Sequence, residues 1–119
     1  MIGVGAVLLV LAAHFAGDFV FQTDEMATRK SGEFCYLYDH VCVYAIPLLA
    51  AAWLLPSLWP EWWFLNVAAH LVVDFFSSRA TARLWKAGER HWFFIVIGLD
   101  QAVHYAALFA SLAWLTGKL

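Results

Sequence analysis

Charged side chains are scarce in this chain, because only 13% of its 119 residues are Asp, Glu, Lys or Arg and 64% are hydrophobic. A typical soluble domain is about 25% charged and roughly 45–50% apolar. The composition therefore predicts an integral membrane protein. The formal net charge of −2 also argues against nucleic acid as a partner, because binding to nucleic acid requires a basic surface.

Cysteine is nearly absent, and no Lys or Arg precedes the first apolar run. The two cysteines, Cys35 and Cys42, are seven residues apart, which on one helix separates their Cα atoms by about 10 Å. That distance is too long for a disulfide within the helix, so both are expected to be small packing residues. Because it lacks a basic leading segment and carries His14 and Asp18, the first apolar run is predicted to be a retained helix rather than a signal peptide.

A membrane chain of this length has room for about four helices of about 20 residues each. We therefore expect an all-α, four-helix membrane bundle that forms a single transmembrane domain over residues 1–119. The predicted spans cover residues 2–21, 34–55, 62–78 and 92–115. A separate amphipathic helix over residues 79–90 is predicted to lie at the membrane surface.

Basic residues fall on one side of these predicted spans. Six of the seven Lys and Arg residues lie in the first and third loops: Arg29, Lys30, Arg79, Arg83, Lys86 and Arg90. Since cytoplasmic loops carry the excess of Lys and Arg, both loops are predicted to be cytoplasmic and both termini to lie outside. The four basic residues from 79 to 90 are expected to attract an anionic lipid headgroup.

Two stretches of the chain share one pattern, AAHFAGDF at residues 12–19 and AAHLVVDF at residues 68–75. A weaker match aligns residues 39–45 with residues 100–106. Together these matches predict two repeated helical hairpins, related by a pseudo-two-fold axis along the membrane normal.

Each strong repeat places a histidine four residues before an aspartate, and this spacing puts both side chains on one face of a helix. The last predicted span has the reverse order, and because it is antiparallel its aspartate and histidine fall at matching depths. The histidines should then form one layer and the aspartates another, about 6 Å nearer the cytoplasm. The predicted cluster comprises His14, Asp18, His70, Asp74, Asp100 and His104, with His40 in the shallower layer and Gln22 and Gln101 in support.

Three carboxylates close together in an interior of low dielectric need cations or protons. No Lys or Arg lies within the predicted spans, so a divalent metal is the economical solution, and zinc, manganese and iron all accept such ligands. The six clustered His and Asp residues are the expected metal ligands. A proton-sharing polar network and the ligation of haem or a pigment are the alternatives.

These residues resemble a family of small bacterial and phage membrane proteins known as domain of unknown function 3307. The resemblance is carried by residues 14–24, His40 with Tyr44, residues 70–74 and residues 100–104, and it covers nearly the whole chain. The resemblance implies a multi-pass protein of the bacterial inner (cytoplasmic) membrane, but it implies no established activity. A looser similarity, in residue type rather than alignment, links the pattern to membrane-bound metal-dependent hydrolases.

The leading functional hypothesis is a metal-dependent hydrolase that acts on a lipid or phosphoester at the cytoplasmic leaflet. Asp18, His40 and Asp74 are its expected catalytic residues, and the metal would activate a water molecule. The chain has no Gly-x-Ser-x-Gly motif, which makes covalent catalysis a weaker hypothesis. The alternatives are a small transporter of ions, protons or metal, and a non-catalytic subunit of a larger membrane complex. A homo-oligomer or a larger membrane complex is the expected assembly.

Overall fold

The computed structural model describes residues 2–55 and 60–117, and all the regular structure in these residues is helical. Its elements are α1 (Val4–Phe15), a π-helical turn η1 (Ala16–Val20), α2 (Asp24–Arg29), α3 (Phe34–Leu54), α4 (Glu61–Lys86) and α5 (Arg90–Leu115). The all-α prediction is therefore confirmed for the described part of the chain.

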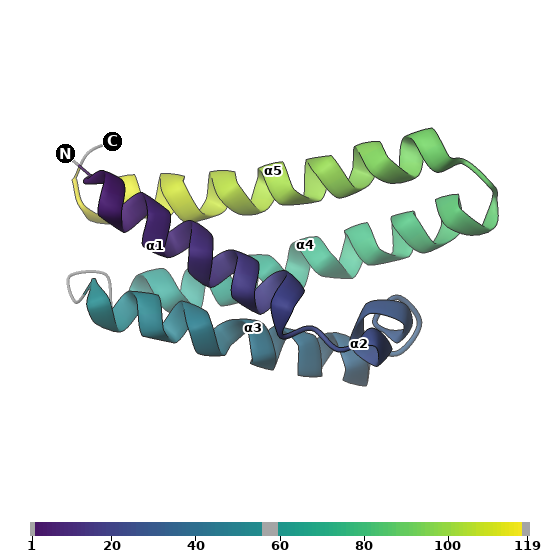
Figure 1. The fold of residues 1–119 in the computed structure, drawn as a ribbon, viewed down its shortest axis with the longest axis horizontal. Helices are drawn as coiled ribbons and strands as arrows, with labels where there is room; N and C mark the ends of the chain where they lie inside the picture. Colours follow the sequence, from purple (N-terminus) through teal and green to yellow (C-terminus); the bar gives the residue numbers. More distant parts are fainter. Residues whose placement is uncertain (1, 56–59, 118–119) are drawn as a thin grey trace.

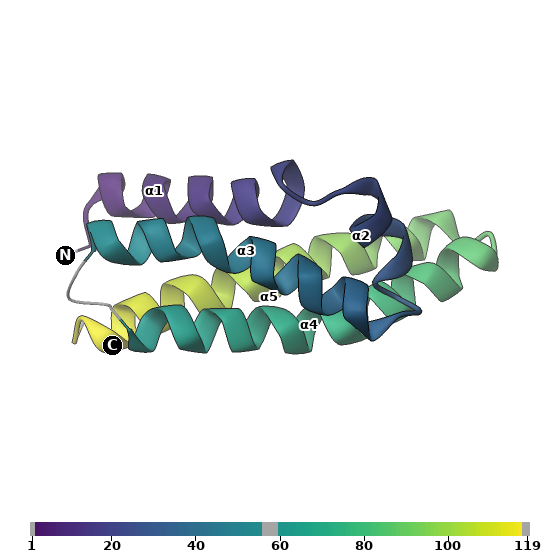
Figure 2. The same ribbon diagram turned by 90° about the horizontal axis from the view of Figure 1, so that it is seen from below.

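The long helices lie side by side along the longest dimension of a molecule that measures 45 × 26 × 19 Å (Figure 1). Helix α3 contacts α1, η1 and α4, while α4 packs against α5. Turning the molecule shows α1 running beside α3, with α4 and α5 on the other side of α3 (Figure 2). The chain termini lie at one end of the bundle, and α2 and the α4–α5 turn lie toward the opposite end.

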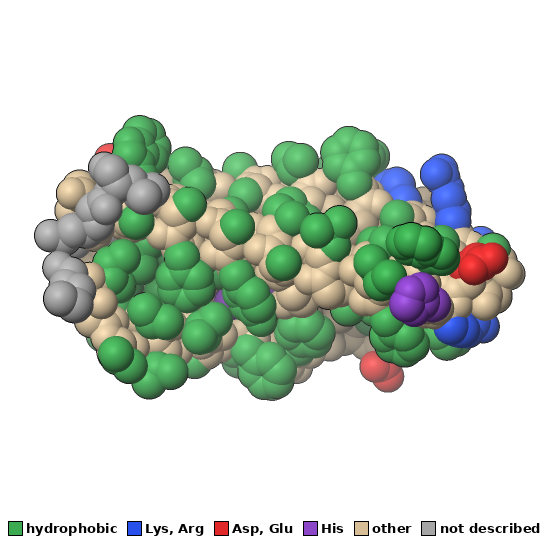
Figure 3. All heavy atoms as spheres, turned by 90° about the horizontal axis from the view of Figure 1, so that it is seen from above, with side chains coloured by type: hydrophobic (Ala, Val, Ile, Leu, Met, Phe, Trp, Pro, Cys, Tyr) green, Lys and Arg blue, Asp and Glu red, His purple; other side chains and the backbone are tan. Residues whose placement is uncertain are grey.

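The end that carries α2 and the α4–α5 turn is named the basic end here. A space-filling view shows Lys and Arg side chains gathered there, whereas hydrophobic side chains are spread over the middle of this face (Figure 3). The basic residues of the two predicted cytoplasmic loops lie at the end of α2, just after it, in the last part of α4 and at the start of α5, so two distant parts of the sequence contribute to this end.

Two boundaries differ from the sequence prediction. The separate surface helix over residues 79–90 is not present, because α4 continues without a break to its end at Lys86. It is followed by Gly88, whose φ of 75° is left-handed. Good helix-forming residues fill this stretch, and glycine is the residue that tolerates such a helix end. The first polar loop also contains a helix, α2, where the Thr23 side chain accepts a hydrogen bond from the Met26 N–H.

Within the described residues, α3 and α5 are long and apolar enough to cross a membrane. Val4–Val20, which combines α1 and η1, is apolar but shorter. Helix α4 carries Asp74 and several basic residues toward its end, and these lower its hydropathy. By length and composition, two of the four predicted spans therefore qualify as candidate membrane spans.

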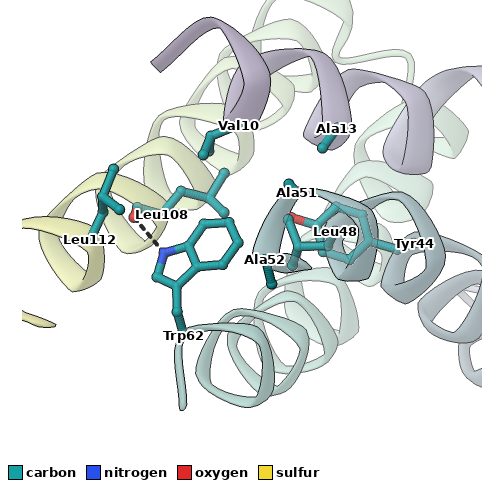
Figure 4. Packing of buried hydrophobic residues seen from close by; sticks show 9 residues of the cluster. All are labelled: Val10, Ala13, Tyr44, Leu48, Ala51, Ala52, Trp62, Leu108 and Leu112. Carbon is teal, nitrogen blue, oxygen red and sulfur yellow. Dashed lines mark hydrogen bonds between the residues drawn. The ribbon is translucent and has the colours of Figure 1, made fainter. Parts of the chain in front are cut away.

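An apolar cluster fills the half of the bundle nearest the termini (Figure 4). Trp62 is fully buried at its centre, and its indole Nε1–H donates to the carbonyl oxygen of Leu108 at 3.1 Å. The cluster comprises Val10, Ala13, Tyr44, Leu48, Ala51, Ala52, Trp62, Leu108 and Leu112. Burial of these side chains supplies the main apolar driving force that holds the helices together at this end.

Gly17 lets the π-helical turn approach α3 closely. A Cβ atom at this position would lie 3.0 Å from Pro47 Cγ and 3.0 Å from the Cα atom of Tyr44. The turn itself is closed by the bond from the Phe21 N–H to the Ala16 carbonyl, five residues apart. Single π-turns are rare and frequently occur at functional sites, and this one carries the buried Asp18.

We expect Gly17→Ala to destabilise the protein by about 1–3 kcal/mol, because the added methyl group must displace the backbone of α3. Gly98→Ala is the matched control, since nothing lies within 4 Å of a Cβ atom there, and the same change should be neutral or stabilising by up to about 1 kcal/mol. Melting temperatures of the two variants in detergent check the prediction. Equal effects at the two positions would contradict it.

Candidate metal centre

Next to the apolar cluster, toward the basic end, the bundle interior becomes polar. Five helical segments supply the polar side chains there: α1 gives His14, η1 gives Asp18, α3 gives His40, α4 gives His70 and Asp74, and α5 gives Asp100 and His104. Among these, His40 and His70 are completely buried and Asp74 is only 2% exposed. Ionisable groups at such positions need partners.

The three predicted His–Asp pairs all lie within one cluster. His14 Nε2 is 3.6 Å from Asp18 Oδ2, and His70 Nε2 is 3.8 Å from Asp74 Oδ2. On α5, His104 Nδ1 is 3.3 Å from Asp100 Oδ2. The helical spacing in the sequence therefore located these side chains correctly, although it did not determine which atoms of different helices face one another.

Four atoms converge most closely, and we name them the four-atom group: Asp18 Oδ1, His40 Nε2, His70 Nε2 and Asp74 Oδ2. His40 Nε2 lies 3.1 Å from His70 Nε2, 3.2 Å from Asp18 Oδ1 and 3.1 Å from Asp74 Oδ2. His70 Nε2 lies 3.7 Å and 3.8 Å from the same two oxygens. Ligands of a tetrahedral zinc ion with bonds of about 2.1 Å are separated by about 3.4 Å, so these spacings suit a small divalent cation.

The hydrogen positions within this group support the same interpretation. Two N–H groups cannot point at each other across 3.1 Å, so at least one of the two Nε2 atoms carries a lone pair rather than a hydrogen. Acceptor atoms that face one another in a buried site favour a cation between them. The Nδ1 atoms of His40 and His70 have no hydrogen-bond partner among the described residues.

His14 uses both of its ring nitrogens in hydrogen bonds outside the four-atom group. Its Nε2 lies 2.9 Å from Gln101 Oε1, and its Nδ1 lies 3.0 Å from the Tyr44 hydroxyl. Because an amide oxygen only accepts, Nε2 donates, and Nδ1 of the neutral ring accepts from Tyr44. His14, expected to be a metal ligand, has no free ring nitrogen here, whereas His40, expected to be a base, lies among the ligand atoms.

Gln101 links several members of the cluster. Its Nε2 donates to Asp18 Oδ2 at 2.8 Å and to Asp100 Oδ2 at 3.1 Å, while its Oε1 accepts from His14. Tyr44 completes the surroundings, since its ring stacks on His70 with centroids 3.7 Å apart. Gln22, the other predicted supporting residue, lines the adjoining cavity, and its Oε1 has no hydrogen-bond partner among the described residues.

Lys30 enters the cluster from the connection between α2 and α3, which the sequence analysis did not foresee. Its Nζ lies 2.7 Å from Asp74 Oδ2. The expectation that the carboxylates have no basic partner is therefore wrong, because a lysine outside the predicted spans reaches inward with its long side chain. With the histidines neutral, three aspartates and one lysine leave two negative charges, which one divalent cation would balance.

A cavity of about 700 Å³ extends from the cluster toward the basic end. Asp18, Asp74 and Asp100 contribute to its wall, and residues 27–33 line another part of it. Helices α4 and α5 complete the wall with Ser77, Ser78, Thr81, Ala82, Trp85, Lys86, Phe93, Ile97 and Gln101. This volume is within the range of small-molecule sites in proteins, about 300–1,000 Å³.

Of the four basic residues predicted to bind a headgroup, Lys86 lines this cavity. The guanidinium groups of Arg79 and Arg90 instead lie over the rings of Phe75 and Trp85, each 3.7 Å from the ring centroid. Both also donate to a backbone carbonyl, Arg79 to that of Phe75 and Arg90 to that of Trp85. The cationic groups of the cavity wall are therefore Arg29, Lys30 and Lys86.

The predicted internal repeat stays a prediction. His14 and His70, the equivalent residues of the two matching stretches, are both buried in the cluster, but their surroundings differ. His14 contacts Gln101 and the Tyr44 hydroxyl, whereas His70 contacts His40 and the face of the Tyr44 ring.

Fold and cluster together define a small all-helical protein with a buried His/Asp site that has the ligand types for a metal ion. The chain belongs to the family described as "Protein of unknown function (DUF3307)", whose model matches residues 6–118. The resemblance seen in the sequence is thus confirmed. No curated protein and no solved structure matches the chain, so the looser similarity to metal-dependent hydrolases gains no support from these comparisons.

Proposed function

We propose that this chain is a multi-pass membrane protein that binds a divalent cation in its His/Asp cluster and uses it to hydrolyse an ester or phosphoester of a lipid at the cytoplasmic leaflet. The observation that carries the proposal is the convergence of the four-atom group beside the cavity. Such a site combines ligands of suitable type and spacing with room for a substrate.

The exposed surface supports membrane insertion. Large hydrophobic side chains face outward on every long helix, among them Leu8, Ile46, Phe64, Phe76 and Phe94, which are 60–67% exposed. An exposed apolar surface of this extent is unusual in a soluble monomer. The 45 Å length of the molecule also matches a bilayer with its headgroup layers, about 40–45 Å thick. Placing the basic end in the cytoplasm satisfies the positive-inside rule.

Cysteine labelling tests this orientation. Ala27→Cys and Ala87→Cys, made in a background without Cys35 and Cys42, are expected to react with a membrane-impermeant maleimide only after cells are opened. Gly3→Cys, near the other end of the bundle, should react from the periplasm in intact cells. Periplasmic labelling of position 27 or 87 would show that the proposed orientation is wrong.

A bound divalent cation would supply Lewis acidity and an activated water for hydrolysis. His40, His70, Asp18 and Asp74 would hold it, as their converging atoms indicate. Gln101 fixes the orientation of the Asp18 carboxylate through its donated hydrogen bond, and Tyr44 fixes the His70 ring by stacking on it. Such support from neighbouring groups is usual for residues that ligate metals.

The cavity wall suits an amphiphilic substrate. Ser77, Ser78 and Thr81 make one part of it polar, whereas Phe93 and Ile97 make another part apolar. Ser78 is 8% exposed, and its Oγ has no hydrogen-bond partner among the described residues. A headgroup can pair with such hydroxyls and with nearby lysines while its acyl part remains against the apolar wall.

Asp74→Asn tests the metal directly. If a cation balances this carboxylate, the substitution should lower metal occupancy and melting temperature together, because bound metal stabilises the folded state by linkage. Metal content of the purified protein, determined by mass spectrometry with and without chelator treatment, is the measurement. In a proton-sharing network the same change should lower stability only through the lost ion pair with Lys30, chelation should change nothing and no metal should co-purify.

The apolar cluster between the site and the termini favours an enzyme over a transporter. Trp62, Leu108 and the other members of that cluster fill the bundle interior on the far side of the histidines. A transport pathway must be able to open to both sides of the membrane, whereas the cavity extends from the cluster toward the basic end. A site that is reached from one leaflet suits hydrolysis of a lipid.

A further inference from the structure

A second set of ligand atoms lies beside the four-atom group, on α5. Asp18, Asp100 and His104 each offer one atom within 4.8 Å of the others. His104 is 2% exposed and Asp18 is 5% exposed, whereas Asp100 is partly exposed and lines the cavity. Two of its members come from α5, which contributes no atom to the four-atom group.

The hydrogen bonds of His104 determine which of its nitrogens carries hydrogen. Its Nδ1 lies 2.9 Å from the backbone carbonyl oxygen of Asp100, and a carbonyl oxygen only accepts. Nδ1 therefore donates, and the neutral ring presents a lone pair at Nε2. That Nε2 is buried, has no hydrogen-bond partner among the described residues and lies 3.5 Å from Asp74 Oδ1.

Two acceptor atoms therefore face each other in the interior, His104 Nε2 and Asp74 Oδ1. A third, Asp100 Oδ1, is also buried without a hydrogen-bond partner among the described residues. Leaving several buried acceptors unpaired is costly, and a cation is a partner that such acceptors accept.

Asp18 and Asp74 each direct one carboxylate oxygen toward the four-atom group and the other oxygen toward α5. Asp74 Oδ2 belongs to the four-atom group, while Asp74 Oδ1 faces His104. Asp18 Oδ1 faces His40 and His70, while Asp18 Oδ2 faces the α5 side at Gln101. Carboxylates shared in this way hold two cations close together in two-metal hydrolytic sites, about 3.5–4 Å apart.

We propose that Asp100 and His104, with the shared carboxylates of Asp18 and Asp74, hold a second divalent cation, so that the centre is binuclear and takes a phosphate group as its substrate. This inference rests on the proposed metal-binding function. One divalent cation already balances the two excess negative charges of the cluster. A second one leaves the site cationic, and this selects an anionic phosphoester over a neutral carboxylic ester.

Manganese is the probe that tests the second site. The full chain in detergent, titrated with Mn²⁺, should bind two equivalents and show the electron paramagnetic resonance spectrum of an exchange-coupled pair. His104→Gln and Asp100→Asn should each bind one equivalent and give the six-line spectrum of isolated Mn²⁺. His91→Gln, which changes an exposed histidine, is the matched control and should keep the coupled spectrum.

The outcomes separate this inference from the proposed function. One equivalent of uncoupled Mn²⁺ in the wild-type chain overturns the binuclear centre and leaves a single metal site standing, whereas no binding at all removes both. Asp100→Asn keeps the inference testable if His104→Gln does not fold, because the Asp100 side chain is 13% exposed and the amide is nearly isosteric.

Phosphate recognition has its own test. Inorganic phosphate should perturb the coupled Mn²⁺ spectrum of the wild-type chain and bind at least tenfold more weakly to Asp100→Asn. Phosphatidic acid in phosphatidylcholine vesicles provides the second arm, and competition by this lipid but not by phosphatidylcholine identifies a lipid headgroup as the source of the phosphate. Binding of free phosphate alone identifies a soluble phosphoester. If neither phosphate binds, the proposed substrate class is wrong.

Discussion

His70→Ala is expected to weaken divalent-metal binding by more than about 100-fold. Changes in groups that merely support a ligand typically cost 10–100-fold, and this substitution removes an atom of the four-atom group itself. His70 is completely buried, its Nε2 lies 3.1 Å from that of His40, and its ring stacks on Tyr44. Isothermal titration with Zn²⁺ of the chelator-treated protein measures the loss.

The same substitution should also reduce the stabilisation that metal gives. At a free metal concentration of 1,000 times the wild-type dissociation constant, linkage contributes about 4 kcal/mol to the wild-type chain, and a 100-fold loss of affinity should remove about 2.7 kcal/mol of this. Deleting a buried ring leaves a cavity as well, so His70→Ala will lower stability even without metal. The informative quantity is therefore the difference in melting temperature with and without metal, determined for both proteins.

His91→Ala is the control for this experiment, since it removes an exposed histidine in the first turn of α5, away from the cluster. Its metal affinity and its metal-dependent shift in melting temperature should equal those of the wild-type chain. If His70→Ala keeps the full metal-dependent shift, the four-atom group does not hold the metal and the proposed function loses its main support.

Helical periodicity explains why so much of the cluster could be predicted from the sequence. A spacing of four residues fixes two side chains on one face, and the reversed order on an antiparallel helix restores the same depth, so residues from α1, α4 and α5 were placed together correctly. The position of His40 beside the aspartates followed from depth alone. These inferences depend on the backbone geometry of straight helices, which the sequence pattern reveals directly.

The contacts between atoms of different helices depend on how the helices rotate and approach one another, and the spacing of residues in the sequence does not predict this. His14 is hydrogen-bonded to Gln101 and Tyr44, whereas His40 lies in the four-atom group, and no spacing rule predicts this difference. No spacing rule connects Lys30 with Asp74, 44 residues away, since a flexible lysine in a loop can reach many partners. The change from apolar to basic residues near residue 79 predicts a helix boundary, but α4 continues through it to Lys86.

Lys30→Met is expected to make the stability of the chain strongly dependent on metal. Without metal, Lys30 is the cation nearest Asp74, with Nζ 2.7 Å from Oδ2. Breaking a buried ion pair by removing one partner costs about 3–5 kcal/mol. Since the Lys30 side chain is 15% exposed, water screens part of this interaction, and we expect a loss of about 2–3 kcal/mol in the chelator-treated protein.

With metal bound, the cost of Lys30→Met should be much smaller, because the divalent cation then compensates the Asp74 carboxylate. The variant should also bind Zn²⁺ more tightly than the wild-type chain, since a competing cation beside a ligand oxygen has been removed. The increase in melting temperature on adding Zn²⁺ should consequently be larger in Lys30→Met than in the wild-type chain. Thermal unfolding in detergent, with and without Zn²⁺, measures both increases.

Lys86→Met distinguishes this effect from a general change in the charge of the cavity. Lys86 also lines the cavity, but it comes from the end of α4, three helical turns beyond Asp74, and its removal should leave the metal-dependent increase unchanged. A proton-sharing network predicts a different pattern, in which Lys30→Met lowers stability by the same amount with and without metal. Because that network contains no metal to replace the missing ammonium group, the response of this one variant to Zn²⁺ separates a metal centre from a network of protons.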